Sequence, residues 1–135
     1  MRLLSQKKRR GAAVVEFAIV APFLLLLIFG IIEFGRAVMV QQLLTNASRE
    51  GARRAILEGA TSEEVEIIVS DYLDNSSVDG ATVVISPSSL NTAGFGDPVN
   101  VTVSVPYDHV SWIPAWFLGG RTLTASTLMR ADRLE

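Results

Sequence analysis

Residues 11–32 read GAAVVEFAIVAPFLLLLIFGII, and this apolar stretch decides the fold of the chain. As an α-helix its 22 residues would extend about 33 Å, which matches the roughly 30 Å of a bilayer's hydrocarbon core. A helix buried in a protein core would show a polar face, whereas this stretch has no polar residue after Glu16. We therefore predict a transmembrane helix over residues 12–34, with a kink at Pro22 because proline lacks the backbone donor.

Charge is distributed asymmetrically around this stretch. Residues 1–11 carry five basic side chains and no acidic one, whereas the rest of the chain carries seven basic and fourteen acidic side chains. Because lysine and arginine beside a transmembrane helix stay in the cytoplasm, the N-terminus should be cytoplasmic and the C-terminal region extracytoplasmic. The sequence argues against a basic arm that binds nucleic acid, since the apolar stretch begins directly after Arg10. We expect no nucleic acid among the partners.

The composition argues against most enzyme classes. Cysteine is absent, which excludes disulfides, thiolate metal sites and thiol catalysis, and His109 is the only histidine. Asp108, His109 and Ser111 resemble a catalytic triad in residue type alone, because neighbours on a strand or tight loop point apart. We predict no catalytic residue, metal, cofactor or small-molecule substrate. An envelope hydrolase that depends on His109 is kept as a third hypothesis behind the two given below.

Glu16 is the one ionisable residue of the apolar stretch. A charged side chain at the bilayer centre costs at least about 2.5–3.5 kcal/mol, so such a residue suggests a functional site. Glu16 lies close to Arg10 in the sequence, and its carboxylate could instead extend to the cytoplasmic interface. A functional role needs a cationic partner, which a new α-amine would supply if the chain were cut a few residues upstream.

The sequence around Glu16 resembles that of type IV prepilin-like proteins. It reads KKRRG and then AAVVEF, so a cut after Gly11 makes Ala12 the N-terminus and Glu16 the fifth residue of the mature chain. The resemblance implies that Gly11 and Ala12 form the site at which a prepilin peptidase acts. It also implies that Glu16 pairs with the α-amine of a neighbouring subunit and so registers the subunits during assembly.

A longer set of motifs, in order between Val15 and Ala55, resembles the TadE-like minor pseudopilins of tight-adherence pilus systems. The motifs are VEFA, a proline inside the apolar stretch, EFGR and NASREGARRA, and the C-terminal LTASTLMRAD resembles the usual end of the family. The resemblance implies a minor pilin that serves in the assembly of a tight-adherence type IV pilus. Its partners would be the inner membrane, the prepilin peptidase, other pilin and minor pilin subunits, and the pilus assembly platform. The alternative is an uncut, single-pass signal-anchored accessory or sensor protein of a cell-envelope complex.

These patterns divide the chain into four segments. Residues 1–11 form a basic leader, 12–34 the transmembrane helix, 35–59 a helical extension and 60–135 an extracytoplasmic domain. The extension lacks proline, and Gly59 is well placed to end it. The resemblance places the protein in the bacterial inner membrane, and in the extracellular pilus after assembly.

Small residues recur every four positions in the helical extension, at Ala47, Gly51 and Ala55. On a helix they line one strip, which lets another backbone approach closely and predicts helix packing. The partner is either another subunit or the protein's own sheet, and both alternatives stay open. Arg53 and Arg54 lie beside the strip, where they are either solvated or part of a docking site.

Polar pairs are predicted at both ends of the extension. Glu33 with Arg36, and Glu50 with Arg54, are spaced for pairs on one helix face, each of which would stabilise the helix by about 0.2–0.5 kcal/mol. After the extension, Thr61 and Glu64 are spaced for a capping box. The box predicts the start of a second helix, which should cover about residues 62–73.

Strands are predicted after the second helix, where the apolar period changes to two. The candidates are residues 81–86, 99–105 and 121–130, of which 99–105 alternates valine with polar residues most regularly. A small antiparallel sheet of about three strands, packed against the long helix, is the economical architecture. The predicted fold class is therefore α+β.

Aromatic residues gather between the last two predicted strands, in residues 107–118. Tyrosine and tryptophan are common both at membrane surfaces and at subunit interfaces, so either contact fits. A third alternative is a lid over the thin core of a small sheet. The sequence leaves all three alternatives open.

Overall fold

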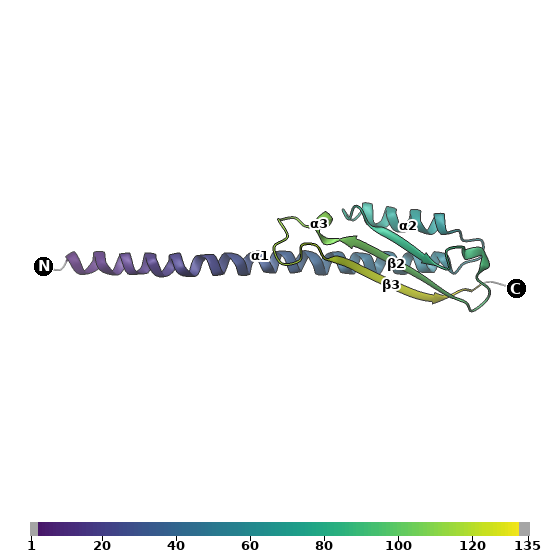
Figure 1. The fold of residues 1–135 in the computed structure, drawn as a ribbon, viewed down its shortest axis with the longest axis horizontal. Coiled ribbons are helices and arrows are strands. Elements are labelled where there is room, and N and C mark those ends of the chain that lie inside the picture. Colours follow the sequence, from purple (N-terminus) through teal and green to yellow (C-terminus); the bar gives the residue numbers. More distant parts are fainter. Residues whose placement is uncertain (1–2, 133–135) are drawn as a thin grey trace.

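The computed structural model describes residues 3–132, with side chains described from Arg10 onward. Helix α1 (Leu3–Ala55) is 53 residues long. The N-terminal part of α1 projects from the domain, and the remaining elements fold against its C-terminal part (Figure 1). We call residues 3–32, which precede the buried Glu33, the bare part of α1. In chain order these elements are α2 (Ser62–Asp74), β1 (Thr82–Ser86), the 3-10 helix η1 (Leu90–Thr92), β2 (Pro98–Pro106), α3 (Tyr107–Val110) and β3 (Thr122–Arg130).

Strands β1, β2 and β3 form one antiparallel sheet in that order. The register pairs Ile85 with Val101 and Val103 with Ala125. Buried residues alternate with more exposed ones along β2, because successive side chains of a strand point to opposite faces. The inward side chains are fully buried valines: Val99, Val101, Val103 and Val105. The three predicted strands are confirmed, and with the helices they confirm the α+β class.

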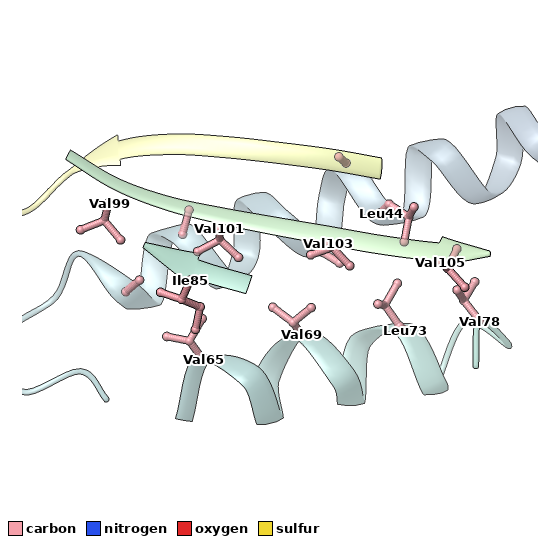
Figure 2. Packing of buried hydrophobic residues seen from close by; sticks show 14 of the residues in the cluster. Leu44, Val65, Val69, Leu73, Val78, Ile85, Val99, Val101, Val103 and Val105 are labelled. Atoms are coloured by element: carbon pink, nitrogen blue, oxygen red, sulfur yellow. The ribbon is translucent and has the colours of Figure 1, made fainter. Parts of the chain in front are cut away.

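The core lies between the sheet and the two longer helices, which pack on the same face of the sheet. Beside Gly51 of α1, side chains of Val65 and Val69 from α2 meet Val101 from β2. Figure 2 shows the apolar face of α2 directed at the inner valines of β2, with Leu44 of α1 in the same cluster. Helix α1 is therefore both the projecting rod and one wall of the domain.

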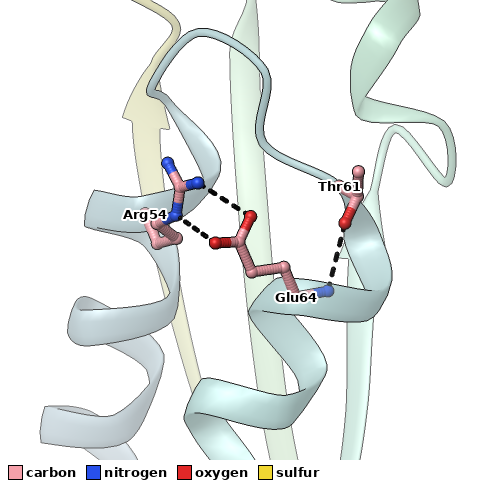
Figure 3. A network of polar contacts seen from close by, with 3 residues as sticks. All are labelled: Arg54, Thr61 and Glu64. Atoms are coloured by element: carbon pink, nitrogen blue, oxygen red, sulfur yellow. Dashed lines mark hydrogen bonds and ion pairs between the residues drawn. The ribbon is translucent and has the colours of Figure 1, made fainter.

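Helix α2 begins with the predicted cap. The Thr61 side chain accepts a hydrogen bond from the Glu64 backbone N–H at 3.2 Å. The reciprocal half of the capping box was wrong, because the Glu64 carboxylate binds Arg54 instead (Figure 3). Arg54 Nε and Nη2 donate to the two carboxylate oxygens at 2.9 and 2.8 Å. A bidentate, charge-assisted pair of this kind is stronger than the predicted single hydrogen bond from the Thr61 backbone N–H to the Glu64 carboxylate.

Helix α1 ends at Ala55 rather than at Gly59, so the predicted boundary was wrong. Past Ala55 the helical ladder gives way to tight turns, in which Leu57 N–H donates to Arg54 C=O at 3.2 Å. Ala60 N–H donates in turn to Leu57 C=O at 3.3 Å, and Gly59 has a φ of 74°. The turns reverse the chain so that α2 packs on the same face of the sheet. Glycine serves this reversal because a positive φ has no steric cost for it.

The kink predicted at Pro22 is absent from the described helix. Helix α1 continues without interruption through Pro22, and its ribbon shows no sharp bend where it projects from the domain (Figure 1). Proline removes only one hydrogen bond of the helical ladder, and the neighbouring turns maintain the helix on both sides.

Candidate functional site

The bare part of α1 is an exposed apolar surface. Its most apolar window has a mean hydropathy of 2.7, and none of that window is buried in the protein. Phe17 and Phe23 are each 70% exposed. A surface of this length and composition fits a membrane anchor, because a hydrocarbon environment removes its apolar side chains from water.

The predicted processing and registration residues all lie on this bare surface. Gly11 and Ala12 are consecutive exposed residues of α1, and Glu16 is exposed about one turn further on. No polar contact reaches Glu16 from any other side chain that the structure describes. Any partner for its carboxylate therefore lies outside the side chains that the structure describes.

The small-residue strip lies inside the domain. Ala47, Gly51 and Ala55 are fully buried or nearly so, and a Cβ placed on Gly51 would lie 2.6 Å from Val69 Cγ2. The strip therefore lets α1 approach α2 and the protein's own sheet, which is the second of the two alternatives left open by the sequence. Of the two neighbouring arginines, Arg54 is engaged with Glu64 and Arg53 is exposed.

Glu33 is buried where the bare part of α1 enters the domain. Its side chain is only 1% exposed. Its carboxylate accepts hydrogen bonds from the backbone N–H groups of Phe117 at 3.1 Å and Leu118 at 2.7 Å. Two donors of the loop between α3 and β3 are therefore fixed to α1 by one carboxylate.

Arg36, one turn further on, binds the other end of the same loop. Its Nε donates to the C=O of Val110, the last residue of α3, at 2.8 Å. Its Nη2 donates to Ser77 C=O at 3.2 Å, and its guanidinium carbon lies 4.6 Å from the centre of the Trp112 ring. We call Glu33 and Arg36 the loop clamp, because together they fix residues 110–118 to α1.

Tyr107 strengthens the clamp from the start of α3. It is fully buried, and its hydroxyl donates to the Glu33 C=O at 2.8 Å. Burial raises the pKa of Tyr107 above its usual value of 10.0, the negative charge of Glu33 adds to the rise, and Arg36 opposes it. The hydroxyl therefore keeps its proton, and the bond that depends on it, throughout the neutral range.

The clamp corrects the pairing that was predicted for Glu33 and Arg36. They form no ion pair with each other in the described structure, and both are buried and bound to backbone groups of distant segments. Spacing along one helix cannot reveal this, because the partners come from the far end of the chain. The signal available in the sequence was the EFGR motif itself, an acid and a base set at the end of an apolar run.

Replacing Glu33 with alanine should release the loop. Phe117 and Leu118 would lose their acceptor, and a hydrogen bond to a charged group contributes about 1.5–3 kcal/mol. We expect amide hydrogen exchange at these two residues to accelerate by about tenfold or more in the full chain in detergent micelles. The control is Glu50→Ala, an exposed acid on the same helix. Unchanged exchange at Phe117 and Leu118 in Glu33→Ala would contradict the clamp.

The residues that resemble a triad have other roles. Asp108 Oδ2 accepts from the Gly120 N–H at 2.9 Å, and Ser111 Oγ donates to the Asp108 backbone C=O at 3.4 Å. His109 is exposed and lies against Gly80, where a Cβ would approach its Nδ1 to 2.8 Å. Among the described residues no three His, Cys, Asp or Glu side chains gather as metal ligands would. The geometry offers no nucleophile paired with a base in this region.

A comparison with known families gives a match in the N-terminal part of the chain. Residues 11–53 match the family described as TadE-like protein. The match begins at Gly11, includes Glu16 and the clamp, and ends at Arg53 within the last turn of α1. It confirms the resemblance found in the sequence for this segment. No curated protein and no solved structure matches the chain.

Proposed function

We propose that this chain, which is TadE-like over residues 11–53, is a minor pilin that serves in the assembly of a tight-adherence type IV pilus. The observation that carries the proposal is the bare part of α1, a continuous helix whose apolar side chains are exposed from Val14 onward. The small domain does not cover this rod, which needs lipid before assembly and neighbouring helices after it. The role is assembly rather than catalysis, and it requires no metal or cofactor.

The proposed sequence of events starts at the cytoplasmic face of the inner membrane. The basic leader, residues 1–11, keeps the N-terminus in the cytoplasm, and a prepilin peptidase cuts after Gly11. The Glu16 carboxylate then pairs with the new α-amine of a neighbouring pilin or minor pilin subunit. Gly11 and Ala12 are exposed, so the folded domain does not cover the bond to be cut.

The N-terminal residue of the protein tests this proposal directly. Protein purified from its native membrane should begin at Ala12, as intact mass and N-terminal sequencing would show. Gly11→Val should remain uncut, because the resemblance implies that the cut requires a very small residue before it. A Cβ at Gly11 meets no atom within 4 Å, so the substitution leaves the fold intact.

A matched control is available on the same helix. A Cβ at Gly35 also meets no atom within 4 Å, so Gly35→Val adds the same side chain to α1 away from the cut site, and this variant should still be processed. A wild-type protein that keeps residues 1–11 in the presence of a competent peptidase would reject processing. That result, together with failure to co-purify with pilus components, would favour the uncut signal-anchored accessory or sensor protein.

A further inference from the structure

The loop between α3 and β3 reaches along α1 onto the bare part of the helix. The Trp116 ring lies 5.6 Å from the Phe29 ring, centre to centre, with the planes tilted by 56°. Phe117 lies beside Gly30, where a Cβ would be 3.7 Å from its ring. The tip of the loop therefore contacts residues that belong to the membrane segment, not to the core of the domain.

The positions of the two tryptophans relative to the membrane segment follow from the residues of α1 that they contact. Phe29 precedes residue 34, the predicted end of the membrane segment, by five residues, which is about 7.5 Å of helix. Arg36, which lies against Trp112, follows Phe29 by seven residues, or about 10 Å. Trp116 is therefore level with the outermost part of the apolar segment, and Trp112 is level with the region just outside it.

The loop tip is apolar and open. Residues 110–120 read VSWIPAWFLGG and contain no charged side chain. Trp112 is 67%, Trp116 62% and Phe117 48% exposed. Beside Phe117 an apolar groove of about 510 Å³ continues onto the helix, lined by Leu26, Leu27, Gly30, Ile31 and Phe34. The exposed face of the loop and the exposed face of the anchor thus form one continuous apolar surface.

Several backbone N–H groups at the C-terminal end of the loop are paired within the protein. An unpaired N–H group in hydrocarbon costs several kcal/mol, so a loop that enters it must pair its donors internally. Glu33 pairs the N–H groups of Phe117 and Leu118, and Asp108 pairs that of Gly120. The clamp thereby removes part of the cost of placing the C-terminal half of this loop at the edge of a bilayer.

We propose that residues 111–118 insert into the outer interface of the same bilayer that holds α1, and that lipid covers the loop. Tryptophan prefers this level of a membrane, because its ring is apolar and its N–H is polar. Lipid is favoured over a second copy of the chain, since the loop is level with a helix segment that itself requires lipid. The loop and α1 then hold the domain at two points, which fixes its height and its rotation on the membrane.

Tryptophan fluorescence tests this proposal, because Trp112 and Trp116 are the two tryptophans of the chain. The full chain would be reconstituted in phosphatidylcholine vesicles with bromine atoms on the acyl chains. We expect Trp116, observed alone in the Trp112→Phe variant, to lose about half or more of its emission. Trp112, observed alone in Trp116→Phe, should be quenched less because it lies beside Arg36, which is about 10 Å further along α1 than Phe29.

A water-exposed control uses the polar face of the sheet. Leu128 is 65% exposed on β3, so Leu128→Trp in a chain without the two native tryptophans should respond to aqueous iodide and not to brominated lipid. Quenching of Trp116 by iodide would place the loop in water and overturn the proposal. Protection from both quenchers would place it against protein and overturn it as well. The measurement uses the uncut chain, so its outcome is independent of processing at Gly11.

Discussion

Replacing Gly51 with valine should destabilise the domain by about 3 kcal/mol or more, because the added side chain has no room. A Cβ at Gly51 would lie 2.6 Å from Val69 Cγ2, 3.3 Å from Val101 Cγ1 and 3.4 Å from Val65 Cγ1. All three neighbours are fully buried, short and β-branched, so none can swing aside. Helix α1 and helix α2 would have to separate to admit even the first carbon.

Thermal unfolding of the full chain in detergent would show this loss as a fall in Tm of about 10 °C or more. Valine is chosen over alanine because the gain in helix propensity from Gly to Ala, about 1 kcal/mol, would offset part of the overpacking. Gly35→Val is the matched control, since it makes the same change on α1 where no atom lies within 4 Å. Equal Tm values for the two variants would contradict the packing described around Gly51.

Replacing Glu16 with alanine should leave cleavage after Gly11 intact and reduce surface piliation by about tenfold or more. The proposed partner of Glu16 is the α-amine of a neighbouring subunit, and close charge pairs at desolvated interfaces show coupling of about 1.5 kcal/mol or more. A loss of about 1.4 kcal/mol is a tenfold change in an equilibrium constant. Cleavage would be followed by intact mass, and piliation by counting filaments on intact cells.

Two further variants separate charge from bulk at this position. Glu16→Gln keeps the size of the side chain and removes its charge, so it should assemble as poorly as Glu16→Ala. Val14→Ala removes apolar volume from a neighbouring site that is 67% exposed, and it should assemble nearly normally. Normal piliation in Glu16→Ala would reject the registration role while leaving the membrane anchor unaffected.

Periodicity was sufficient to predict the main elements of the fold. The valines of β2 alternate with polar residues because one face of the strand is buried, and that pattern was clear in the sequence. The cap at Thr61 was likewise predictable, since it depends on residues three positions apart. Both signals depend on residues close together in the sequence, and the tertiary fold left these two in place.

The clamp and the Arg54–Glu64 pair could not be predicted, because their partners are set by the tertiary fold. Glu33 binds backbone groups 84 and 85 residues away, and no spacing rule extends so far. Arg54 had an apparent partner in Glu50 one turn back, yet it binds Glu64, which the reversal after α1 brings close. The small residues around Gly51 predicted that another backbone packs closely against α1. Which element packs there, α2 together with the sheet, became clear only from the tertiary structure.

Helix α1 passes from the membrane segment into the core with no joint between them. Ala37, Val40 and Leu44, which follow the bare part directly, already belong to the buried core. The projecting part of α1 and the domain are therefore one rigid unit for forces along the helix axis. An axial pull on the N-terminal part is carried straight into the sheet, and a lift of one helical turn raises the whole domain by about 5.4 Å.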